Sequence, residues 1–370
     1  MKIGIMTFWW SQDNYGQILQ CYALQKYLCD AGHDAYLIRY KNEEWSPYWK
    51  RMLKALNPVL LFRFIKRKIN YRKVMKEQKS NNRCFDDFRK KYIKQSEVFY
   101  NSYKQLKENP PEADTYIVGS DQVWNFTLFP QSKKNINTSI HTYMLDFGKT
   151  TTKKMSYAAS WGMKTLSQNL IDEISPLLQK FSYVSVREEN GITLCKKCGY
   201  ENAEFVCDPT LLLSADVYRN LYMKKKIRKI EKKYIMLYML NNECDFDIQR
   251  VYDYAREKKL DVVYVTGNGV IDSREKFFAT IPEWIYLIDN AEYVITNSFH
   301  CCVFSSIFNK KFGVAKLKGK AEGMNTRFES LFSLLGIESR YVDMSFSNLE
   351  KEYTVNKINK KSSFWEKLNV

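Results

Sequence analysis

The chain opens on the apolar run KIGIM at residues 2–6, followed by the polar turn SQDNYGQ at residues 11–17. Apolar residues then recur at helical spacing from Leu19 to Leu28, and after the stop AGH at residues 31–33 a second apolar run occupies residues 35–39. This pattern predicts a strand, a helix and a second strand, which is the βαβ unit of a parallel, doubly wound sheet. The predicted fold class is therefore α/β.

A second series of alternating strands and helices begins after the lysine-rich stretch at residues 224–233. In the first series, further strands are predicted at 115–118, 154–158, 183–186 and 205–207. In the second, strands are predicted at 234–240, 261–266, 293–296 and 311–314, with helices near 247–258, 282–289 and 300–308. We therefore predict two Rossmann-like, doubly wound domains at residues 1–223 and 224–345, and a helical tail at 346–370 that packs back on the first domain.

A basic helical insert is predicted in the first domain at about residues 45–110. Between Lys50 and Lys76 the chain has ten Lys or Arg and no Asp or Glu, interleaved with large apolar residues. Two interpretations stay open: a helical subdomain with a solvated basic face, or a surface helix that contacts anionic lipid or a lipid-linked phosphate.

The net charge of +17 calls for an anionic partner, which could be nucleic acid, the anionic inner leaflet of a membrane or a phosphorylated substrate. No nucleic-acid-binding motif accompanies the charge, so no nucleic acid is expected. No apolar run approaches the roughly 20 residues that span a bilayer, and the N-terminus lacks the pattern of a signal peptide. Nine cysteines without a framework spacing favour a reducing compartment, so we expect a cytoplasmic protein, and no metal site is expected at Cys195-x-x-Cys198.

Several polar segments follow predicted strands, where ligands bind in open α/β sheets. In the first domain they are Asn14–Gly16, Ser120–Asn125, Ser160 and Arg187. Gly16 permits a close backbone approach, and Asn14 either caps the following helix or contacts a ligand. Arg187 either pairs with a neighbouring glutamate or holds a carboxylate or phosphate with its planar guanidinium.

In the second domain, residues 296–302 (TNSFHCC) join a predicted strand to a predicted helix. His300 is one of only three histidines, and it alone opens a helix at the carboxyl end of a strand. Because an imidazole can hold or release a proton near neutral pH, His300 is the favoured functional histidine. Arg327, just before another helical pattern, is a further candidate for the same cleft.

Together these segments resemble the polysaccharide pyruvyl transferase family over nearly the whole chain. The resemblance rests on NYG at 14–16, VGSDQVW at 118–124, SVRE at 185–188, DPT at 208–210, PEW at 282–284, AEYVITNSFH at 291–300 and NTR at 325–327. It implies a fold similar to two-domain GT-B glycosyltransferases, and an enzyme that transfers the pyruvyl unit of phosphoenolpyruvate to a sugar as a cyclic ketal. No metal, nucleotide or other cofactor is implied.

Carried over residue by residue, Arg187 matches a family arginine that holds the charged donor, and His300 matches the family's general acid. Many members have an arginine two positions before that histidine, where this chain has Ser298, so Arg327 is the candidate that replaces it. The expected donor site is Arg187, Arg327, Ser298, Asn14 and Gly16. The expected acceptor site is Ser120, Asp121, Gln122, Trp124, Asn125 and Ser160, in which Asp121 either accepts a proton from the sugar or binds its hydroxyls.

The resemblance implies that the acceptor is a hexose in a lipid-linked repeat unit of capsule or exopolysaccharide. Such units are assembled at the inner face of the membrane. The basic insert would make a peripheral contact with the membrane there. Two alternatives stay open. One is a GT-B glycosyltransferase that uses a nucleotide sugar, and the other is a non-catalytic protein that binds anionic glycans or a lipid surface.

Overall fold

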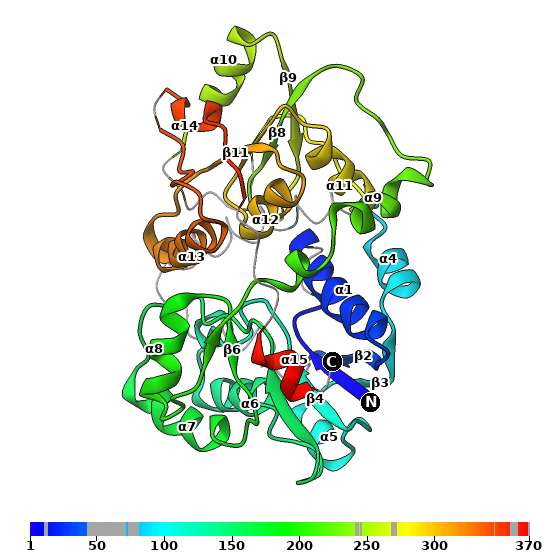
Figure 1. Ribbon diagram of the computed structural model, residues 1–370, viewed down its shortest axis with the longest axis vertical. Helices are drawn as coiled ribbons and strands as arrows, with labels where there is room; N and C mark the ends of the chain where they lie inside the picture. The colour runs from blue at the N-terminus through cyan, green and yellow to red at the C-terminus, as the bar shows by residue number, and fades with distance from the viewer. Residues whose placement is uncertain are drawn as a thin grey trace.

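The computed structural model describes residues 1–10, 14–42, 72, 81–240, 244, 246–267, 272–343, 345–355 and 362–368. These residues form two main parallel sheets, one from each half of the chain, which lie in the lower and upper parts of Figure 1, and a third sheet of two short strands. Except for Arg72, the basic stretch from Lys50 to Lys76 lies outside the described residues, and so does the core of the predicted insert.

The N-terminal sheet has the strand order β3-β2-β1-β4-β5 and is parallel throughout. Its strands are β1 (Lys2–Met6), β2 (Asp34–Tyr40), β3 (Gln95–Tyr100), β4 (Thr115–Val118) and β5 (Lys153–Ser156). Two short strands, β6 (Ser185–Val186) and β7 (Glu204–Phe205), pair with each other beyond β5. This order places the chain's first strand at the centre of the sheet, as a doubly wound fold requires.

The predicted insert does not extend to residue 110. Residues 85–108 form α4 (Phe85–Tyr92), β3 and α5 (Tyr103–Glu108), and β3 pairs with β2 as a member of the main sheet. The prediction missed β3 because it is an edge strand, with residues 97–99 exposed, and so shows no continuous apolar run.

Of the remaining helices of this half, three follow strands of the N-terminal half, and the fourth, α9, packs on α11 (Ile281–Asp289) and leads into the second half. They are α6 (Lys133–Tyr143), α7 (Gln168–Leu178), α8 (Glu189–Lys197) and α9 (Ala215–Met223), with the short 3-10 turns η1 (Phe126–Leu128) and η2 (Pro209–Leu212). The helix α1 (Tyr15–Asp30) joins β1 to β2. Twelve of its residues are buried, because α1 lies between the N-terminal sheet and elements of the second half.

The C-terminal sheet has the order β11-β10-β8-β9, also parallel. Its strands are β8 (Tyr234–Tyr238), β9 (Asp261–Val265), β10 (Tyr293–Thr296) and β11 (Lys311–Val314). The main helices are α10 (Gln249–Glu257), α11 (Ile281–Asp289), α12 (Phe299–Ile307) and α13 (Thr326–Leu335). The 3-10 segment η3 (Gly319–Asn325) directly precedes α13. The strands read as near-continuous apolar runs because helices cover the sheet.

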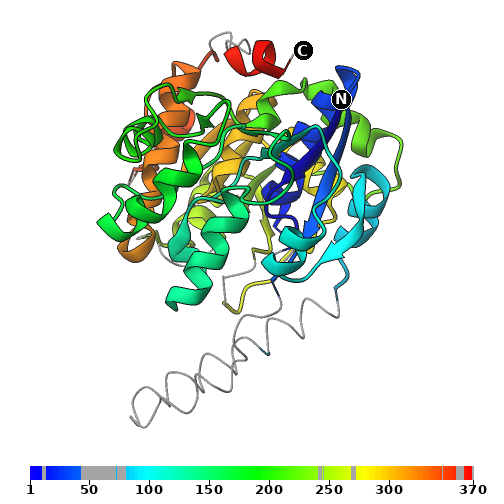
Figure 2. The ribbon, with the colours of Figure 1, turned by 90° about the horizontal axis from the view of Figure 1, so that it is seen from below.

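The two halves share one hydrophobic core cluster that contains residues of both sheets. Tyr15 of α1 stacks on Trp284 of α11, with ring centroids 5.1 Å apart, and its hydroxyl donates to the Ala279 carbonyl at 2.6 Å. After α14 (Ser347–Glu350), the last described helix is α15 (Ser363–Leu368), which lies near the N-terminus in both Figure 1 and Figure 2. There Trp365 packs on Tyr27 and Tyr157 of the first half.

Candidate active site

A buried carboxylate, Asp208, is the centre of a polar cluster where the two halves meet. It precedes η2, and its Oδ1 accepts from the backbone N–H and the hydroxyl of Thr210 at 3.0 and 2.7 Å. Its Oδ2 accepts from Ser120 Oγ at 2.8 Å and from Arg187 Nη1 at 3.0 Å. Burial alone would raise the pKa of Asp208, but the charges of His300 and Arg187 outweigh burial and hold this pKa well below its usual range. Asp208 is therefore a fixed negative charge.

His300 reaches the same carboxylate from the second half. It lies in the first turn of α12, directly after β10, and Ser298 caps that helix by accepting from the Cys301 N–H at 3.4 Å. The His300 Nε2 atom is 3.5 Å from Asp208 Oδ2 and 3.4 Å from Arg187 Nη1. Gly16 packs against the other side of the ring, where a Cβ on Gly16 would lie 2.3 Å from His300 Nδ1. The imidazole is thus held between α1 and the Arg187–Asp208 pair.

Two buried guanidiniums, of Arg187 and Arg327, flank the ring of Phe299. Their Cζ atoms lie 4.5 and 5.9 Å from the ring centroid, and the two residues are only 2% and 7% exposed. The Nε and Nη2 atoms of Arg187 are buried with no hydrogen-bond partner among the described residues. Arg327 donates from Nε to the Met324 carbonyl at 3.3 Å. Burial, and then the charge of Arg187, lower the pKa of Arg327 to about 10.

Two buried cations repel each other. Buried N–H groups without a hydrogen-bond acceptor also destabilise the fold unless a ligand accepts from them. No carboxylate within the described residues forms an ion pair with Arg327, and Asp208 takes only one nitrogen of Arg187. The pair is therefore suited to an anionic ligand that carries more than one charged group.

Asp121 lies beside this cluster in a strained backbone conformation. Its φ angle is +83°, in the left-handed region that residues with a side chain rarely adopt. Its Oδ2 accepts from Gln17 Nε2 at 2.9 Å, and its Oδ1 accepts from the Gln122 N–H at 2.8 Å. Because its carboxylate is held in place next to Ser120, which bonds both Asp208 and Arg187, Asp121 is the second acid–base candidate.

Several residues predicted to bind ligand have structural roles instead. Trp124 was expected to line the acceptor site, but it is fully buried against Trp161 and Phe181, and its indole N–H donates to the Tyr143 carbonyl at 3.1 Å. A buried indole with a satisfied N–H is a core residue, so this expectation is corrected.

Asn125 and Ser160, also predicted to contact the acceptor, hold loops together. Asn125 Nδ2 donates to the Gln122 side chain at 3.1 Å and to the Gly162 carbonyl at 3.3 Å. The Ser160 hydroxyl donates to the buried carboxylate of Glu188. Neither residue is more than 1% exposed, so neither presents a polar group to a sugar in this structure.

Most of the remaining predicted residues support the site without presenting a free polar group to a ligand. Ser120 is buried and orients Asp208 and Arg187. Asn14 and Ser298 are helix caps, and Gly16 gives room for His300. Gln122 is half-buried beside Asp121.

The sequence reasoning did not assign a site role to Asp208, Phe299 or Gln17. Asp208 belongs to the DPT segment, but an aspartate that precedes a proline and a threonine is also an ordinary helix cap, and it serves as one here. Its link to His300 follows from the docking of the two halves, which no local pattern encodes. Phe299 reads as a core residue, and its contact with two arginines depends equally on the tertiary fold.

Comparison with known proteins defines the class first. The chain has the two-sheet, GT-B-like fold of the MnaA–UDP co-structure from S. aureus, with a TM-score of 0.53, 11% identity, and coverage of 100% of this chain and 97% of that one. Weaker similarity is found to a UDP-GlcNAc 2-epimerase from Neisseria meningitidis bound to UDP-GlcNAc (TM-score 0.43, 8% identity, 94% and 89% of the two chains covered). It is also found to the glycosyltransferase SnogD from Streptomyces nogalater (TM-score 0.39, 9% identity, 92% and 87% covered).

The family is defined by the sequence. The profile of the polysaccharide pyruvyl transferase family matches residues 14–314, which is most of the chain, so this protein belongs to that family. A search among curated proteins gave no match. Within the part of the chain that the structure describes, no helix is long and apolar enough to cross a membrane.

Proposed function

We propose that this protein transfers the pyruvyl unit of phosphoenolpyruvate to two hydroxyls of a hexose in a polysaccharide repeat unit, forming a cyclic ketal. The observation that carries the proposal is the pair of buried guanidiniums at Arg187 and Arg327, one of which has two unpartnered nitrogens. Phosphoenolpyruvate has a carboxylate and a phosphate close together, and two guanidiniums can neutralise both.

The proposed chemistry begins with proton transfer from His300 to the terminal methylene carbon of the donor. This converts the methylene into a methyl group and leaves an electron-poor centre at C2, which a sugar hydroxyl attacks. Phosphate leaves, and a second hydroxyl of the same hexose closes the ketal. The two hydroxyls lose two protons; one balances the proton given to the methyl group, and the other leaves with the phosphate.

Asp208 and Asp121 would support this step in different ways. Asp208 lies 3.5 Å from His300 Nε2 and accepts from Arg187, so it holds the proposed acid and the proposed donor-binding arginine next to each other. Asp121, bonded to Gln17, lies at the end of the neighbouring strand and is the group proposed to accept a proton from the sugar hydroxyl.

The alternative of a nucleotide-sugar glycosyltransferase is favoured by one observation, the similarity in fold to a protein solved with UDP. A fold hosts many activities, however, and the pyruvyl transferase family match covers residues 14–314. A non-catalytic protein that binds anionic glycans or lipids would not need a histidine held beside a buried carboxylate and a buried arginine.

The test is to incubate the purified protein with lipid-linked or free hexose acceptors, and with phosphoenolpyruvate or nucleotide sugars as donors. We expect release of inorganic phosphate from phosphoenolpyruvate together with the mass gain of one pyruvyl ketal on the acceptor. Consumption of a nucleotide sugar would support the glycosyltransferase instead, and consumption of neither donor would support a binding protein.

A further inference from the structure

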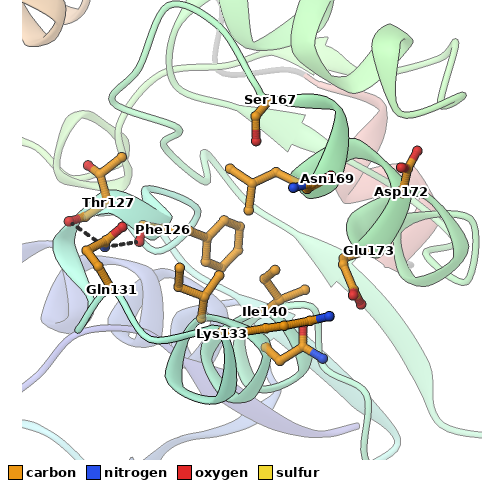
Figure 3. Close-up of a pocket in the computed structure, with 12 residues that line it drawn as sticks. Phe126, Thr127, Gln131, Lys133, Ile140, Ser167, Asn169, Asp172 and Glu173 are labelled. Carbon is orange, nitrogen blue, oxygen red and sulfur yellow. Dashed lines mark hydrogen bonds between the residues drawn. The ribbon is translucent and has the colours of Figure 1, made fainter.

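A groove of about 550 Å³ lies between α6 and α7 in the first half of the chain. Figure 3 shows the ring of Phe126 between side chains from these two helices. The polar side chains around it include Gln131, Asn137, Asn169, Asp172 and Glu173. Those of Asn137, Asn169 and Glu173 make no hydrogen bond or ion pair among the described residues, so their polar groups remain available to a ligand.

The groove is at the same edge of the N-terminal sheet as the candidate active site. Its floor residue, Phe126, follows the loop after β4 that also carries Asp121, and α7 begins just after the loop that carries Ser160. Each of these segments follows the carboxyl end of a parallel strand, and such ends lie along one edge of a sheet.

The two loops are bonded to each other along their length. The Ser160 N–H donates to the Asp121 carbonyl at 3.0 Å, the Trp124 N–H donates to the Ser160 carbonyl at 3.2 Å, and Asn125 Nδ2 donates to the Gly162 carbonyl at 3.3 Å. Gly162 itself has a φ of +56°, and a Cβ there would lie 2.4 Å from Gln122 Oε1. The segments that line the groove are therefore continuous in sequence with the two loops that carry Asp121 and Ser160, and these loops hold each other in place.

The chemistry of the lining favours a neutral ligand with many hydroxyls. Among the lining residues only Lys133 is basic, whereas Asp172 and Glu173 are acidic, in a chain whose net charge is +17. An anionic ligand would find no excess of positive charge here. Amides both donate and accept, carboxylates accept, and apolar floor residues suit the C–H face of a sugar ring.

We propose that this groove binds the non-reacting sugars of an oligosaccharide acceptor, while the hexose to be modified occupies the candidate active site that contains Asp121. The inference rests on the proposed function and deepens it, because it makes the acceptor a glycan of several sugars. It also explains why the predicted acceptor residues Trp124 and Asn125 are buried: they hold the loop in place, and the residues that follow them, such as Thr127 and Gln131, line the groove.

The test compares the double variant Asn169→Ala/Glu173→Ala with the wild type. The matched control is Lys164→Ala/Thr165→Ala, which truncates two exposed polar side chains just before α7 that do not line the groove. The probes are glucose, galactose, and neutral tetrasaccharides of each. Binding is measured by calorimetry without donor, and KM is measured with saturating phosphoenolpyruvate. Asn169→Tyr, which fills the groove, serves as a second variant, and thermal unfolding checks the fold of each.

We expect both groove variants to weaken tetrasaccharide binding and raise its KM by about tenfold, the cost of one or two hydrogen bonds, and to leave the monosaccharide KM unchanged. The control should match the wild type. Equal tetrasaccharide affinity in wild type and groove variants, or an equal change for mono- and tetrasaccharides, would overturn the inference. If the variants lose binding but no acceptor is ever pyruvylated, the groove is supported and the proposed function fails.

Discussion

The two buried arginines, Arg187 and Arg327, are the residues that an anionic ligand would stabilise most. Among the described residues Arg327 donates to one backbone carbonyl and forms no ion pair. Burial, and then the charge of Arg187, lower its pKa to about 10. A buried cation with so few partners is tolerated where function requires it.

We therefore expect Arg327→Ala to weaken phosphoenolpyruvate binding by about ten- to a hundredfold, because one charge-assisted contact of about 2 kcal/mol is lost. The stability of the unliganded protein should not fall, because the substitution also removes repulsion between two cations. Calorimetric titration and thermal unfolding measure both effects, with the exposed Arg256→Ala on α10 as the control. Unchanged donor affinity in a folded Arg327→Ala variant would remove Arg327 from the donor site.

Asp208 acts on the reaction through its neighbours, and its loss should have a distinct signature. In Asp208→Asn the shape is kept, but the negative charge that accepts from Arg187 and lies 3.5 Å from His300 Nε2 is lost. We expect turnover to fall by about 10²-fold, because Arg187 and His300 are no longer held in place. Because the pKa of wild-type Asp208 is held well below its usual range, this carboxylate stays ionised at ordinary assay pH, so the wild-type rate should show no acid limb from Asp208. Breaking the buried pair with Arg187 should also cost about 3–5 kcal/mol of stability. Steady-state kinetics and thermal unfolding measure both effects, and wild-type turnover in a destabilised Asp208→Asn variant would make Asp208 a structural residue only.

The sequence predicted which individual residues lie at strand ends, but not which of their side chains contact one another. Arg187 and His300 are far apart in the chain, and their 3.4 Å approach is set by the docking of the two halves. Trp124 was expected in the acceptor site because its neighbours in sequence are polar residues of that site, whereas its neighbours in space are Trp161 and Phe181.

Among the elements, α1 is the one that positions the site most directly. It begins at the carboxyl end of β1, brings Tyr15 against Trp284 of the second half, and presents Gly16 to the His300 ring. Gly16 was expected to allow a ligand close to the backbone. In the structure it is the imidazole that makes this close approach.

Gly16→Ala should therefore displace His300. The added Cβ would lie 2.3 Å from the ring, which is too close for any real contact, so the ring or α1 must shift. Because small misplacements of a catalytic group cost about 10²-fold in rate, we expect a large fall in turnover in a protein that still folds. The control is Gly323→Ala, where a Cβ meets nothing within 4 Å. Steady-state kinetics of both variants make the test, and near-normal turnover in Gly16→Ala would show that the ring is not held as described.

Strands were predicted correctly where a continuous apolar run marks them, and were missed where the strand is defined by its pairing partner. Buried parallel strands such as β4 and β10 begin and end where the apolar runs do. The edge strand β3 was missed because half of its side chains face solvent, and such a strand is defined by its pairing with β2.

For the whole molecule, the two sheets define a GT-B-like protein whose site lies between halves that share one core cluster. We propose domain boundaries near residues 223 and 345. The contacts of α15 with Tyr27 and Tyr157 tie the end of the chain to the first half. Alternation of strands and helices predicts this class, whereas the angle at which the halves dock, and hence the site, comes from packing across the interface.

The positive charge of the chain leads to a prediction about its location. We expect association with anionic vesicles that fades as salt rises, because each Lys or Arg near such a surface contributes about 1 kcal/mol and is screened over roughly 8–10 Å. Replacing Lys66, Arg67 and Lys68 with glutamine should reduce vesicle sedimentation. Equal binding to neutral and anionic vesicles would favour a solvated basic face.

The proposed role of His300 as the acid is tested by His300→Asn, measured for donor affinity and for turnover separately. Asparagine keeps a hydrogen-bonding group but has no proton to give, so we expect phosphoenolpyruvate to bind within several-fold of wild type. Turnover, followed by phosphate release and ketal mass with saturating acceptor, should fall by about 10²–10⁴. Near-normal turnover in His300→Asn would contradict the account, because the proton would then come from another group and His300 would only orient the donor.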